Sequence, residues 1–340
     1  NQTEAVGTPE QRTTSTTWHP QYRLPLQVTT PGQTTSYTHD AAGNVLTRTD
    51  TDTDTDTATG EIRTERSTYN ATGQVLTQDG PRTDVNDVTT LSYYPANDAC
   101  VGCRGQLQTQ TNAVGHVTQY TSYNGRGQVT ALTAPNGQVT TWDYDLRGRL
   151  LRQTVGSDVT AYTYDLAGRL LTQTAPDGTT QSYTYDAQDR LSEVWDATGN
   201  TTRHSYNALG QRTQTALYDQ AGVLTLQQTH TYDTQGRLQA TTDGLGRSTA
   251  YAYDPQGQLL SSTDPSGRTT THSYDPLGRR SQSRDPLSGT LTTTYDPQDQ
   301  PLRITDPRGL STTYDPNAWG EVQRLDSPDT RSTVTSYDPA

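Results

Sequence analysis

Tyr253-Asp254-Pro255-Gln256-Gly257-Gln258-Leu259 shows in its clearest form a unit that recurs along this chain. The Tyr-Asp step returns every 21 residues between Tyr232 and Tyr295. A fixed period of this size indicates stacked supersecondary units. The residues that we assign to the structural repeat are Tyr144, Asp145, Gly148, Tyr164, Asp165, Gly168, Tyr232, Asp233, Gly236, Tyr253, Asp254, Gly257, Tyr274, Asp275, Gly278, Tyr295 and Asp296.

Each repeat is predicted to contain two turns. In the repeat from Tyr253 they span Asp254–Gly257 and Asp264–Gly267. Asp at the first position, Pro at the second and Gly at the fourth favour a type I turn that is closed by a left-handed Gly, which is a three-residue hairpin loop. Asn136-Gly137 and Asp177-Gly178 fill the second slot in two other repeats, and such pairs predict tighter turns.

The composition points to a thin sheet. Only 29% of the residues are hydrophobic, and Phe and Met are absent, so a thick globular core cannot be filled. Abundant Thr and Tyr favour strands. The fold class that we predict is all-β, a long antiparallel β-hairpin meander. Open twisted sheets of more than about 10 strands curl, so this ribbon is expected to coil into a hollow shell or tube.

The two faces of the sheet are predicted from the strand period of two. The rings of Tyr251 and Tyr253 point the same way, and Leu238 represents the one aliphatic residue that each Gly-Arg-Leu step adds. We therefore expect a Tyr/Leu ladder on one face, with Thr, Ser, Gln and Arg on the other.

The repeats divide the chain. Residues 1–17 show no pattern and are expected to form an irregular N-terminal segment, followed by the repeat shell at 18–340. Two departures interrupt the shell, an insertion at 50–61 and a Cys-containing loop at 95–105. Because the chain ends within a repeat, we interpret it as a segment of a longer protein.

The repeated Tyr-Asp-x-x-Gly-Arg-Leu resembles the YD-repeats of RHS proteins, which include Rhs polymorphic toxins, the B/C cocoon of insecticidal toxin complexes and the teneurins. The resemblance covers roughly residues 18–340. It implies a β-ribbon that spirals into a hollow RHS/YD-repeat shell, which in many members encloses a C-terminal toxin or processed fragment. The family's cage-closing motif with its cutting aspartate is not found in this sequence, so no residue here is expected to carry self-cleavage.

Several function classes are disfavoured. A net charge of −12 argues against nucleic acid as a partner, because nucleic acid requires a basic surface. No apolar run reaches membrane-spanning length. The sequence holds no Gly-x-Ser-x-Gly, phosphate loop or His-Glu-x-x-His, and its six His are scattered. We therefore predict no catalytic or cofactor-binding residue, no cofactor and no enzyme activity.

The Cys pair is open to several interpretations. Cys100 and Cys103 are separated by two residues, which suits a local disulfide, free thiols, half of a zinc site or a redox pair. No second Cys pair supplies the other zinc ligands, and no helix start is predicted for redox chemistry. A loop-stapling disulfide or free thiols is the preferred interpretation.

The insertion has a weak resemblance to a calcium loop. Asp50, Asp52, Asp54 and Asp56 would take the first four ligand positions and Glu61 the twelfth. Thr55 stands where that loop requires Gly. A solvated hairpin of alternating Thr and Asp is the simpler interpretation, so these residues are only weak metal candidates and no metal is predicted.

The sequence therefore predicts a structural, non-catalytic shell that encloses or presents a polypeptide, as in toxin encapsulation. Two alternatives stay open. One is a subunit of an extracellular tube or filament that self-associates through its edge strands; the other is a surface adhesin that binds glycans. The expected partners are an enclosed polypeptide or further RHS repeats of the same protein. The resemblance also implies a secreted or cell-surface location of bacterial type.

Overall fold

The computed structural model describes residues 1–53 and 61–338. In these ranges the chain forms thirty strands, one 3-10 turn and no α-helix. All strands belong to one sheet, and the recorded pairings of consecutive strands are antiparallel. The predicted all-β hairpin meander is therefore confirmed.

The strands are short, as a wall of repeated hairpins requires. Their bounds in the first half of the chain are β1 (Gln2–Glu4), β2 (Arg12–Trp18), β3 (Pro25–Thr30), β4 (Gln33–His39), β5 (Val45–Asp52), β6 (Ile62–Tyr69), β7 (Val75–Asp79), β8 (Thr89–Tyr93), the 3-10 turn η1 (Val101–Cys103), β9 (Leu107–Thr111), β10 (Val117–Tyr123), β11 (Val129–Thr133), β12 (Val139–Tyr144), β13 (Leu150–Val155), β14 (Asp158–Tyr164) and β15 (Leu170–Thr174).

The second half continues the same pattern. Its strands are β16 (Thr180–Tyr185), β17 (Leu191–Trp195), β18 (Thr201–Tyr206), β19 (Arg212–Tyr218), β20 (Leu224–Tyr232), β21 (Leu238–Asp243), β22 (Ser248–Tyr253), β23 (Leu259–Thr263), β24 (Thr269–Tyr274), β25 (Arg280–Arg284), β26 (Thr290–Tyr295), β27 (Pro301–Thr305), β28 (Ser311–Pro316), β29 (Val322–Ser327) and β30 (Arg331–Val334).

The N-terminal segment differs from the expectation. Residues 1–17 were expected to be irregular, but they contain β1 and most of β2. The two strands pair in register, with Gln2 opposite Thr14. The segment lacks the Tyr-Asp step but is rich in Thr, whose β-branched side chain favours strands. Whether a domain boundary lies at residue 18 stays a prediction.

The turns follow the predicted chemistry. At Asp254–Gly257, the Gly257 N–H donates to the Asp254 carbonyl at 3.1 Å and the Asp254 N–H to the Gln258 carbonyl at 3.0 Å. Gly257 has a φ of 91°, which is the left-handed conformation predicted for it. The register shifts between Ala252 and Tyr253, so a bulge adjoins this turn.

The Asn136-Gly137 turn is not tighter than the others. The Gly137 N–H donates to the Ala134 carbonyl and the Ala134 N–H to the Gln138 carbonyl, both at 2.9 Å. This is the same three-residue loop. The tighter turn would make Pro135 the residue that flanks Asn136-Gly137, and Pro lacks the N–H that this position would donate across the hairpin. The Asn136 side chain accepts a hydrogen bond from the Gln138 N–H at 3.0 Å instead.

Three turns carry another residue where the rest have Gly: Asp189, Ser288 and Asp299 have φ of 64°, 74° and 70°. The left-handed conformation costs a non-Gly residue about 1–2 kcal/mol, and Asp less than most. Ser288→Gly removes this cost, and the gain exceeds the entropy that the more flexible Gly loses on folding. We therefore expect a net rise in the free energy of unfolding of about 0.5–1 kcal/mol.

The reverse change, Gly257→Ala, should lower the free energy of unfolding by about 1 kcal/mol. A Cβ at Gly257 meets no atom within 4 Å, so the loss comes from the backbone alone. Urea unfolding checks both variants. Midpoints equal to that of the wild type would contradict the assignment of strain to this turn position.

The wall has almost no core. In the ranges that the structure describes, Cys103, Ala216 and Pro316 are the only buried apolar residues. Most strand side chains are half-buried, as in a single sheet with both faces open. The cohesion of the wall must therefore come from contacts between neighbouring hairpins.

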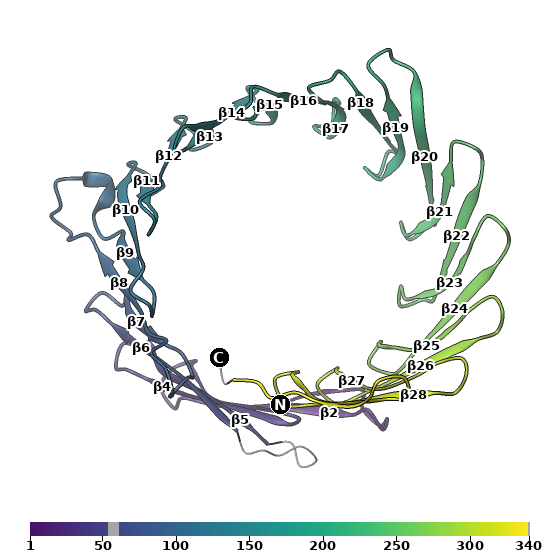
Figure 1. The fold of residues 1–340 in the computed structure, drawn as a ribbon, viewed down its shortest axis with the longest axis horizontal. Helices are drawn as coiled ribbons and strands as arrows, with labels where there is room; N and C mark the ends of the chain where they lie inside the picture. Colours follow the sequence, from purple (N-terminus) through teal and green to yellow (C-terminus); the bar gives the residue numbers. More distant parts are fainter. Residues whose placement is uncertain (54–60, 339–340) are drawn as a thin grey trace. The chain divides into compact units, whose positions relative to one another are not determined.

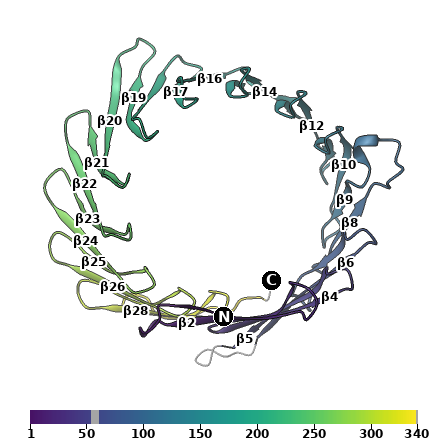
Figure 2. The ribbon, with the colours of Figure 1, turned by 180° about the vertical axis from the view of Figure 1, so that it is seen from behind.

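The chain divides into two compact units. One contains residues 1–92, 110–116 and 270–340, and the other residues 93–109 and 117–269. In the second unit, successive hairpins from β10 to β23 lie side by side in chain order (Figure 1). In the first unit, the N-terminal strands β2–β5 lie beside the C-terminal strands β26–β28 in both views (Figures 1 and 2).

Candidate functional site

The most regular side-chain arrangement in the structure joins each hairpin to the next. At Asp186, one carboxylate oxygen accepts the backbone N–H of Arg190 at 3.0 Å and the other accepts its Nε at 2.7 Å. The Arg190 guanidinium lies 4.6 Å from the centre of the Tyr206 ring, and its Nη1 donates to the Asn207 carbonyl at 3.0 Å. The Tyr206 hydroxyl donates to the Leu191 carbonyl at 2.7 Å.

We call this arrangement the repeat lock: a turn Asp, the Arg four residues later, and the Tyr of the following repeat. In each lock the ion pair holds the Arg within its own turn. The cation–π contact and the hydrogen bond from the Tyr hydroxyl to a backbone carbonyl then join this turn to the next repeat. Further locks are Asp145/Arg149/Tyr164, Asp165/Arg169/Tyr185, Asp233/Arg237/Tyr253 and Asp275/Arg279/Tyr295.

The lock changes the expected position of Arg. The sequence predicted Arg on the face opposite Tyr, but Arg190 and its equivalents lie against the Tyr rings. The bulge beside each Tyr breaks the simple alternation. Each Arg also follows a left-handed turn residue, Asp189 before Arg190 and Gly in the other locks, so the strand period does not fix its side. The expectation that Asp serves as a turn residue is confirmed.

Each lock contributes modestly, but the contribution recurs. A half-exposed ion pair contributes about 0.5 kcal/mol, a surface cation–π contact about 0.5–1 kcal/mol and the Tyr hydroxyl bond about 1 kcal/mol. The hydrogen bond from the Arg190 side chain lowers the pKa of Asp186, so the carboxylate stays charged at neutral pH. Burial raises the pKa of Tyr164 and Tyr185, which keeps their hydroxyls protonated as donors.

The other repeat residues take related positions. The Tyr232 hydroxyl donates to the Arg212 carbonyl at 2.8 Å, and burial raises the pKa of Tyr144 in β12. In the repeat before Tyr274, Gln258 stands at the sequence position that Arg takes in the locks. The predicted turn glycines all have positive φ: Gly148, Gly168, Gly236, Gly257 and Gly278.

The Cys-containing loop folds around η1. The sulfurs of Cys100 and Cys103 lie 2.02 Å apart, joined as a disulfide, and Cys103 is fully buried. The Gly105 N–H donates to the Tyr94 carbonyl at 3.0 Å and closes the loop. A disulfide that staples this loop was part of the preferred interpretation. The disulfide in solution stays a prediction, which a measurement of intact mass under non-reducing conditions can test.

The insertion at 50–61 lies partly outside the residues that the structure describes. Asp54 and Asp56 fall in residues 54–60, which the structure does not describe. Asp50 and Asp52 belong to β5 and are buried, so this part of the insertion is not the solvated hairpin that we expected. Asp50 accepts the Thr35 hydroxyl at 2.5 Å and pairs with Arg48 at 3.0 Å, while Glu61 pairs with Arg63.

A second arrangement was not predicted at all. Within the first unit, C-terminal turns contact N-terminal hairpins, and we call this contact the terminal seam. The Arg12 Nη1 donates to the Pro297 carbonyl at 3.0 Å and to the Asp299 carboxylate at 2.8 Å. The Gln298 side chain donates to the Pro31 carbonyl at 2.7 Å. Asp296 at the base of this turn is buried.

Arg63 makes the other half of the terminal seam. Its guanidinium donates to Glu321 at 2.7 Å and to Glu61 at 3.0 Å, and it stacks 4.1 Å from the centre of the Trp319 ring. The carboxylate of Glu321 also accepts the Asn317 side chain at 2.6 Å, and hydrogen bonds from Arg63 and Asn317 outweigh desolvation and lower the pKa of Glu321. The seam therefore joins residues that lie more than 250 positions apart in the sequence.

Family comparison identifies these repeats. Seven segments of the chain match the family described as RHS Repeat: 104–138, 123–160, 164–194, 185–220, 232–261, 253–290 and 295–332. Together they cover more than half of the sequence. The chain belongs to the RHS repeat family. The resemblance drawn from the Tyr-Asp steps is thereby confirmed, and a comparison with curated proteins finds no match.

Solved structures share the fold of this RHS chain. The crystal structure of TcdB2-TccC3-TEV matches with a TM-score of 0.66 and 17% identity, over 93% of this chain and 19% of that one. TcdB2-TccC3 matches with a TM-score of 0.62 and 18% identity, over 100% and 22%. The Tc holotoxin pore of Photorhabdus luminescens matches with a TM-score of 0.62 and 18% identity, over 99% and 21%.

At these identities the likeness shows the fold, which is that of an RHS shell. The chain spans about a fifth of the length of these matched chains. The family and its relatives support a structural role, and no catalytic family is indicated. Within residues 1–53 and 61–338, no group of three potential metal ligands occurs, and no helix has the length and apolar character needed to cross a membrane.

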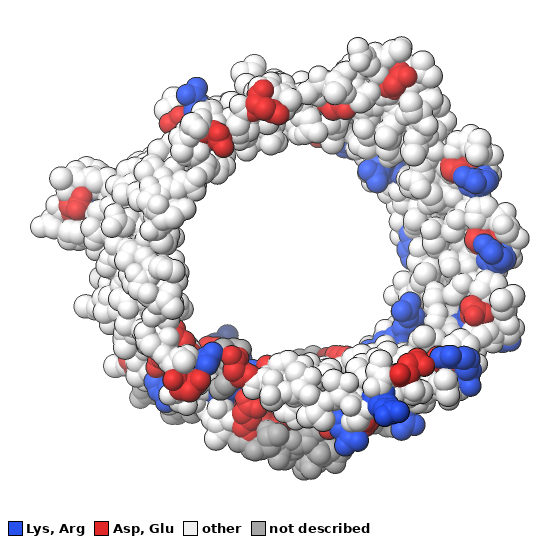
Figure 3. Space-filling view, in the orientation of Figure 1, with Lys and Arg blue, Asp and Glu red and all other residues white. Residues whose placement is uncertain are grey.

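Charge is distributed locally on the RHS chain. The visible face shows small charged groups between wide uncharged areas; acidic and basic side chains adjoin at many of them, and a few acidic groups stand alone (Figure 3). This distribution follows from the locks, in which every Asp has its Arg within the same turn. The net charge of −12 is therefore not gathered into one acidic patch on that face.

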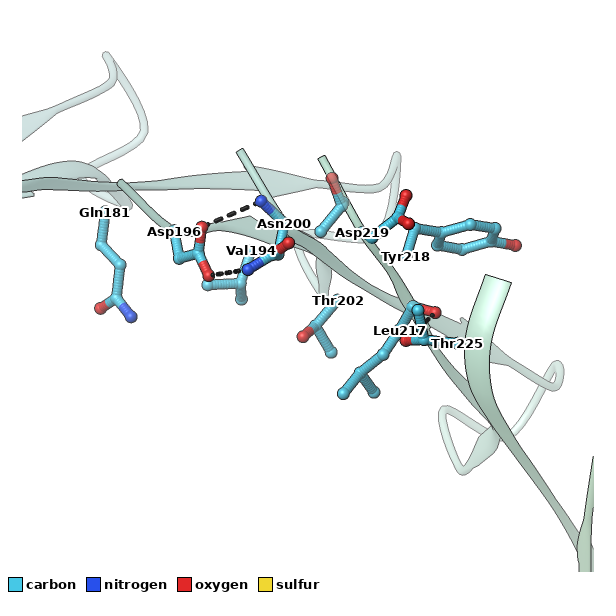
Figure 4. Close-up of a pocket in the computed structure, with 10 residues that line it drawn as sticks. Gln181, Val194, Asp196, Asn200, Thr202, Leu217, Tyr218, Asp219 and Thr225 are labelled. Atoms are coloured by element: carbon cyan, nitrogen blue, oxygen red, sulfur yellow. Dashed lines mark hydrogen bonds between the residues drawn. The ribbon is translucent and has the colours of Figure 1, made fainter. Parts of the chain in front are cut away.

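One pocket of the second unit is open to solvent and has a mixed polar and apolar lining. It has a volume of about 410 Å³ and is lined by the turn at Asp196 and by strands β18 and β19 (Figure 4). Asp196 accepts the side chains of Asn200 at 2.8 Å and Thr198 at 2.7 Å, which lowers its pKa to about 2. These polar groups are already used to close the turn, so the pocket offers little to a ligand.

Two histidines of the second unit predict a pH dependence, and burial lowers the pKa of His272, which has the same repeat position in the first unit, as well. His204 and His230 stand two residues before a repeat Tyr, where other repeats have Tyr183 or Tyr251. Burial, and secondarily the charge of Arg212, lowers the pKa of both below 6.5. The unfolded chain therefore takes up these protons more readily, so the stability present above pH 6.5 should decline as the pH falls through 6.5 toward the folded pKa.

Replacing both histidines with Tyr should remove this part of the pH dependence, because Tyr fills the same position elsewhere and is neutral in this range. Urea unfolding at pH 7.5, 6.5 and 5.5 measures the slope. A double variant with the same slope as the wild type would show that the pH dependence has another source.

Proposed function

We propose that this chain is a wall segment of an RHS shell that keeps a polypeptide apart from the surrounding solvent. The observation that carries the proposal is the repeat lock. It holds each hairpin to its neighbours while the sheet buries almost no apolar side chains. A single sheet of this kind is stabilised by contacts between neighbouring hairpins and needs no buried core. Such a sheet is suited to covering a space.

The chemistry of the wall suits this role. The locks place Asp, Arg and Tyr where they satisfy one another, so the wall offers few unpaired charges to a polypeptide beside it. The pocket at Asp196 is open to solvent, and the Asp196 carboxylate in it is already bonded within its own turn. This favours a covering role over ligand binding, and it gives the glycan-binding alternative no specific support.

The enclosure would be shared with more repeats. The matched chains are about five times as long as this one, so we propose further RHS repeats as partners, together with the enclosed polypeptide. The Tc toxin relatives lead us to propose a secreted or cell-surface location. The proposed role is non-catalytic.

Labelling of single cysteines tests the proposal. Thr249 and Ala250 are adjacent in β22, so their side chains lie on opposite faces of the sheet. We expect Thr249→Cys and Ala250→Cys to react equally with a small maleimide, and one of them to resist a large polyethylene-glycol maleimide. Equal reaction of both with the large reagent would overturn an enclosing role.

Solution scattering supplies an independent measurement. A compact protein of 340 residues has a radius of gyration of about 20 Å. A wall around a solvent-filled space has its mass far from the centre, so we expect a clearly larger value with a folded-state scattering profile. A radius near that of a compact protein would contradict the proposal.

A further inference from the structure

Two turns share a sequence that no other turn of the chain has. Asp186-Ala187-Gln188-Asp189 and Asp296-Pro297-Gln298-Asp299 are its two Asp-x-Gln-Asp turns. In both, Asp replaces the closing Gly and adopts positive φ, 64° and 70°. In both, an Arg twenty residues earlier pairs with this Asp, Arg169 with Asp189 and Arg279 with Asp299.

The turns that follow also correspond. Twenty-one residues after each first Asp stand Asn207-Ala208-Leu209-Gly210 and Asn317-Ala318-Trp319-Gly320. The chain thus contains two copies of one turn pair. Each copy lies within a single compact unit, so each can be considered by its own contacts.

The later copy is occupied, because it forms the C-terminal side of the terminal seam. Asp299 binds Arg12, Gln298 binds the Pro31 carbonyl, and Trp319 stacks on Arg63. The turn pair therefore acts as a docking edge for hairpins β2–β6. Its first residues are buried by this contact, with Asp296 only 8% and Asn317 only 3% exposed.

The earlier copy presents the same groups to solvent. The Asp189 side chain is 73% exposed, against 47% for Asp299, and Leu209 is 81% exposed. The backbone of Asp189 is strained, because a residue other than Gly has positive φ there. Such strain is retained where neighbouring groups or a function require the residue. At Asp299 the ion pair with Arg12 is such a reason.

We infer that the turns Asp186–Asp189 and Asn207–Gly210 form a docking edge for hairpins β2–β6 of a second copy of this chain. These hairpins are the element that fits the corresponding turn pair, since they carry both Arg12 and the Pro31 carbonyl. The contact is independent of whether the wall encloses a polypeptide.

The two edges differ in strength in a defined way. Leu209 replaces the Trp319 ring and Gln211 replaces Glu321, so Arg63 finds neither a cation–π partner nor a carboxylate at the earlier edge. The terminal seam is also intramolecular and gains from effective concentration. Hairpins β2–β6 therefore stay on their own seam, and a second copy binds when the seam is weakened.

The test uses the same substitution at both edges. Asp299→Gly and Asp189→Gly each remove one carboxylate and restore the Gly that other turns have, so neither should impair folding. Sedimentation equilibrium over a range of concentrations should show at least about tenfold tighter self-association for Asp299→Gly than for the wild type. The double variant should be monomeric, since its earlier edge no longer binds Arg12.

Hydrogen exchange in β2–β4 reports whether the seam has opened. Faster exchange in monomeric Asp299→Gly, without association at the highest concentration, would overturn the inference. Association of the double variant equal to that of Asp299→Gly would overturn it as well. A variant that combines Asp299→Gly with Trp319→Leu should show faster exchange in β2–β4. Unchanged exchange in that variant would show that these turns do not hold β2–β6, and the inference would lose its basis.

Discussion

Arg63→Ala should lower the free energy of unfolding of the terminal seam by about 3 kcal/mol, because it leaves two half-buried carboxylates without their cation. Arg63 is 12% exposed and bonds to Glu61 and Glu321, while its guanidinium stacks on Trp319. Loss of all three contacts should release the N-terminal hairpins. Hydrogen exchange in β6 and β28, with urea unfolding, measures the effect.

Two variants set the scale of this result. Arg63→Lys keeps the charge but cannot bind two carboxylates and stack on a ring at once, so it should recover less than half of the loss. Arg152 is 58% exposed and lies 4.0 Å from Asp143, so Arg152→Ala should change stability by less than about 0.5 kcal/mol. An Arg63→Ala effect as small as that would show that the seam contributes nothing to stability.

Tyr206→Ala should destabilise hairpins β17–β18 by about 3 kcal/mol, near the lower limit for losing a large aromatic ring from a packed site. The substitution removes the stack with Arg190, the hydroxyl bond to Leu191 and the packing of the ring between two repeats. Because stability in repeat proteins is a sum of units and their interfaces, the loss should be local. Amide exchange in β17–β19 should accelerate while exchange in β25–β27 stays unchanged.

Tyr206→Phe separates the parts of the lock. It keeps the ring over Arg190 and removes one hydrogen bond, so its cost should be about 1 kcal/mol. Leu166→Ala is a matched control, because this side chain is 92% exposed at a turn tip and its loss should be nearly neutral. Acceleration of exchange throughout the sheet by Tyr206→Ala would contradict a nearest-neighbour lock.

The turns and strands could be predicted because their chemistry is local. Asp254, Pro255 and Gly257 contain the information that closes a three-residue loop, and the 21-residue period repeats it. The prediction of a tighter Asn136-Gly137 turn was wrong for an equally local reason, since Pro135 lacks the N–H that the tighter turn needs beside the pair. Strands β1 and β2 lack the Tyr-Asp step, so a search by period passed over them.

The locks and the seam could not be predicted in the same way. Arg190 follows the left-handed residue Asp189 and adjoins a bulge, and the strand period does not fix the direction of a side chain there. The partners of Arg12 and Arg63 stand 287 and 258 residues away, and no spacing rule connects them. One signal was present in the sequence: Asp189 and Asp299 both replace the closing Gly of an Asp-x-Gln-Asp turn.

The nearest-neighbour character of the lock has a mechanical consequence. Tension at a free end of such a ribbon would load the outermost hairpin alone, because no shared interior passes the force to distant strands. The ribbon would peel one repeat at a time, and each 21-residue step would release about 70 Å of extended chain. Because each repeat contacts only its neighbours, the ribbon can unfold from one end while the remaining hairpins stay folded.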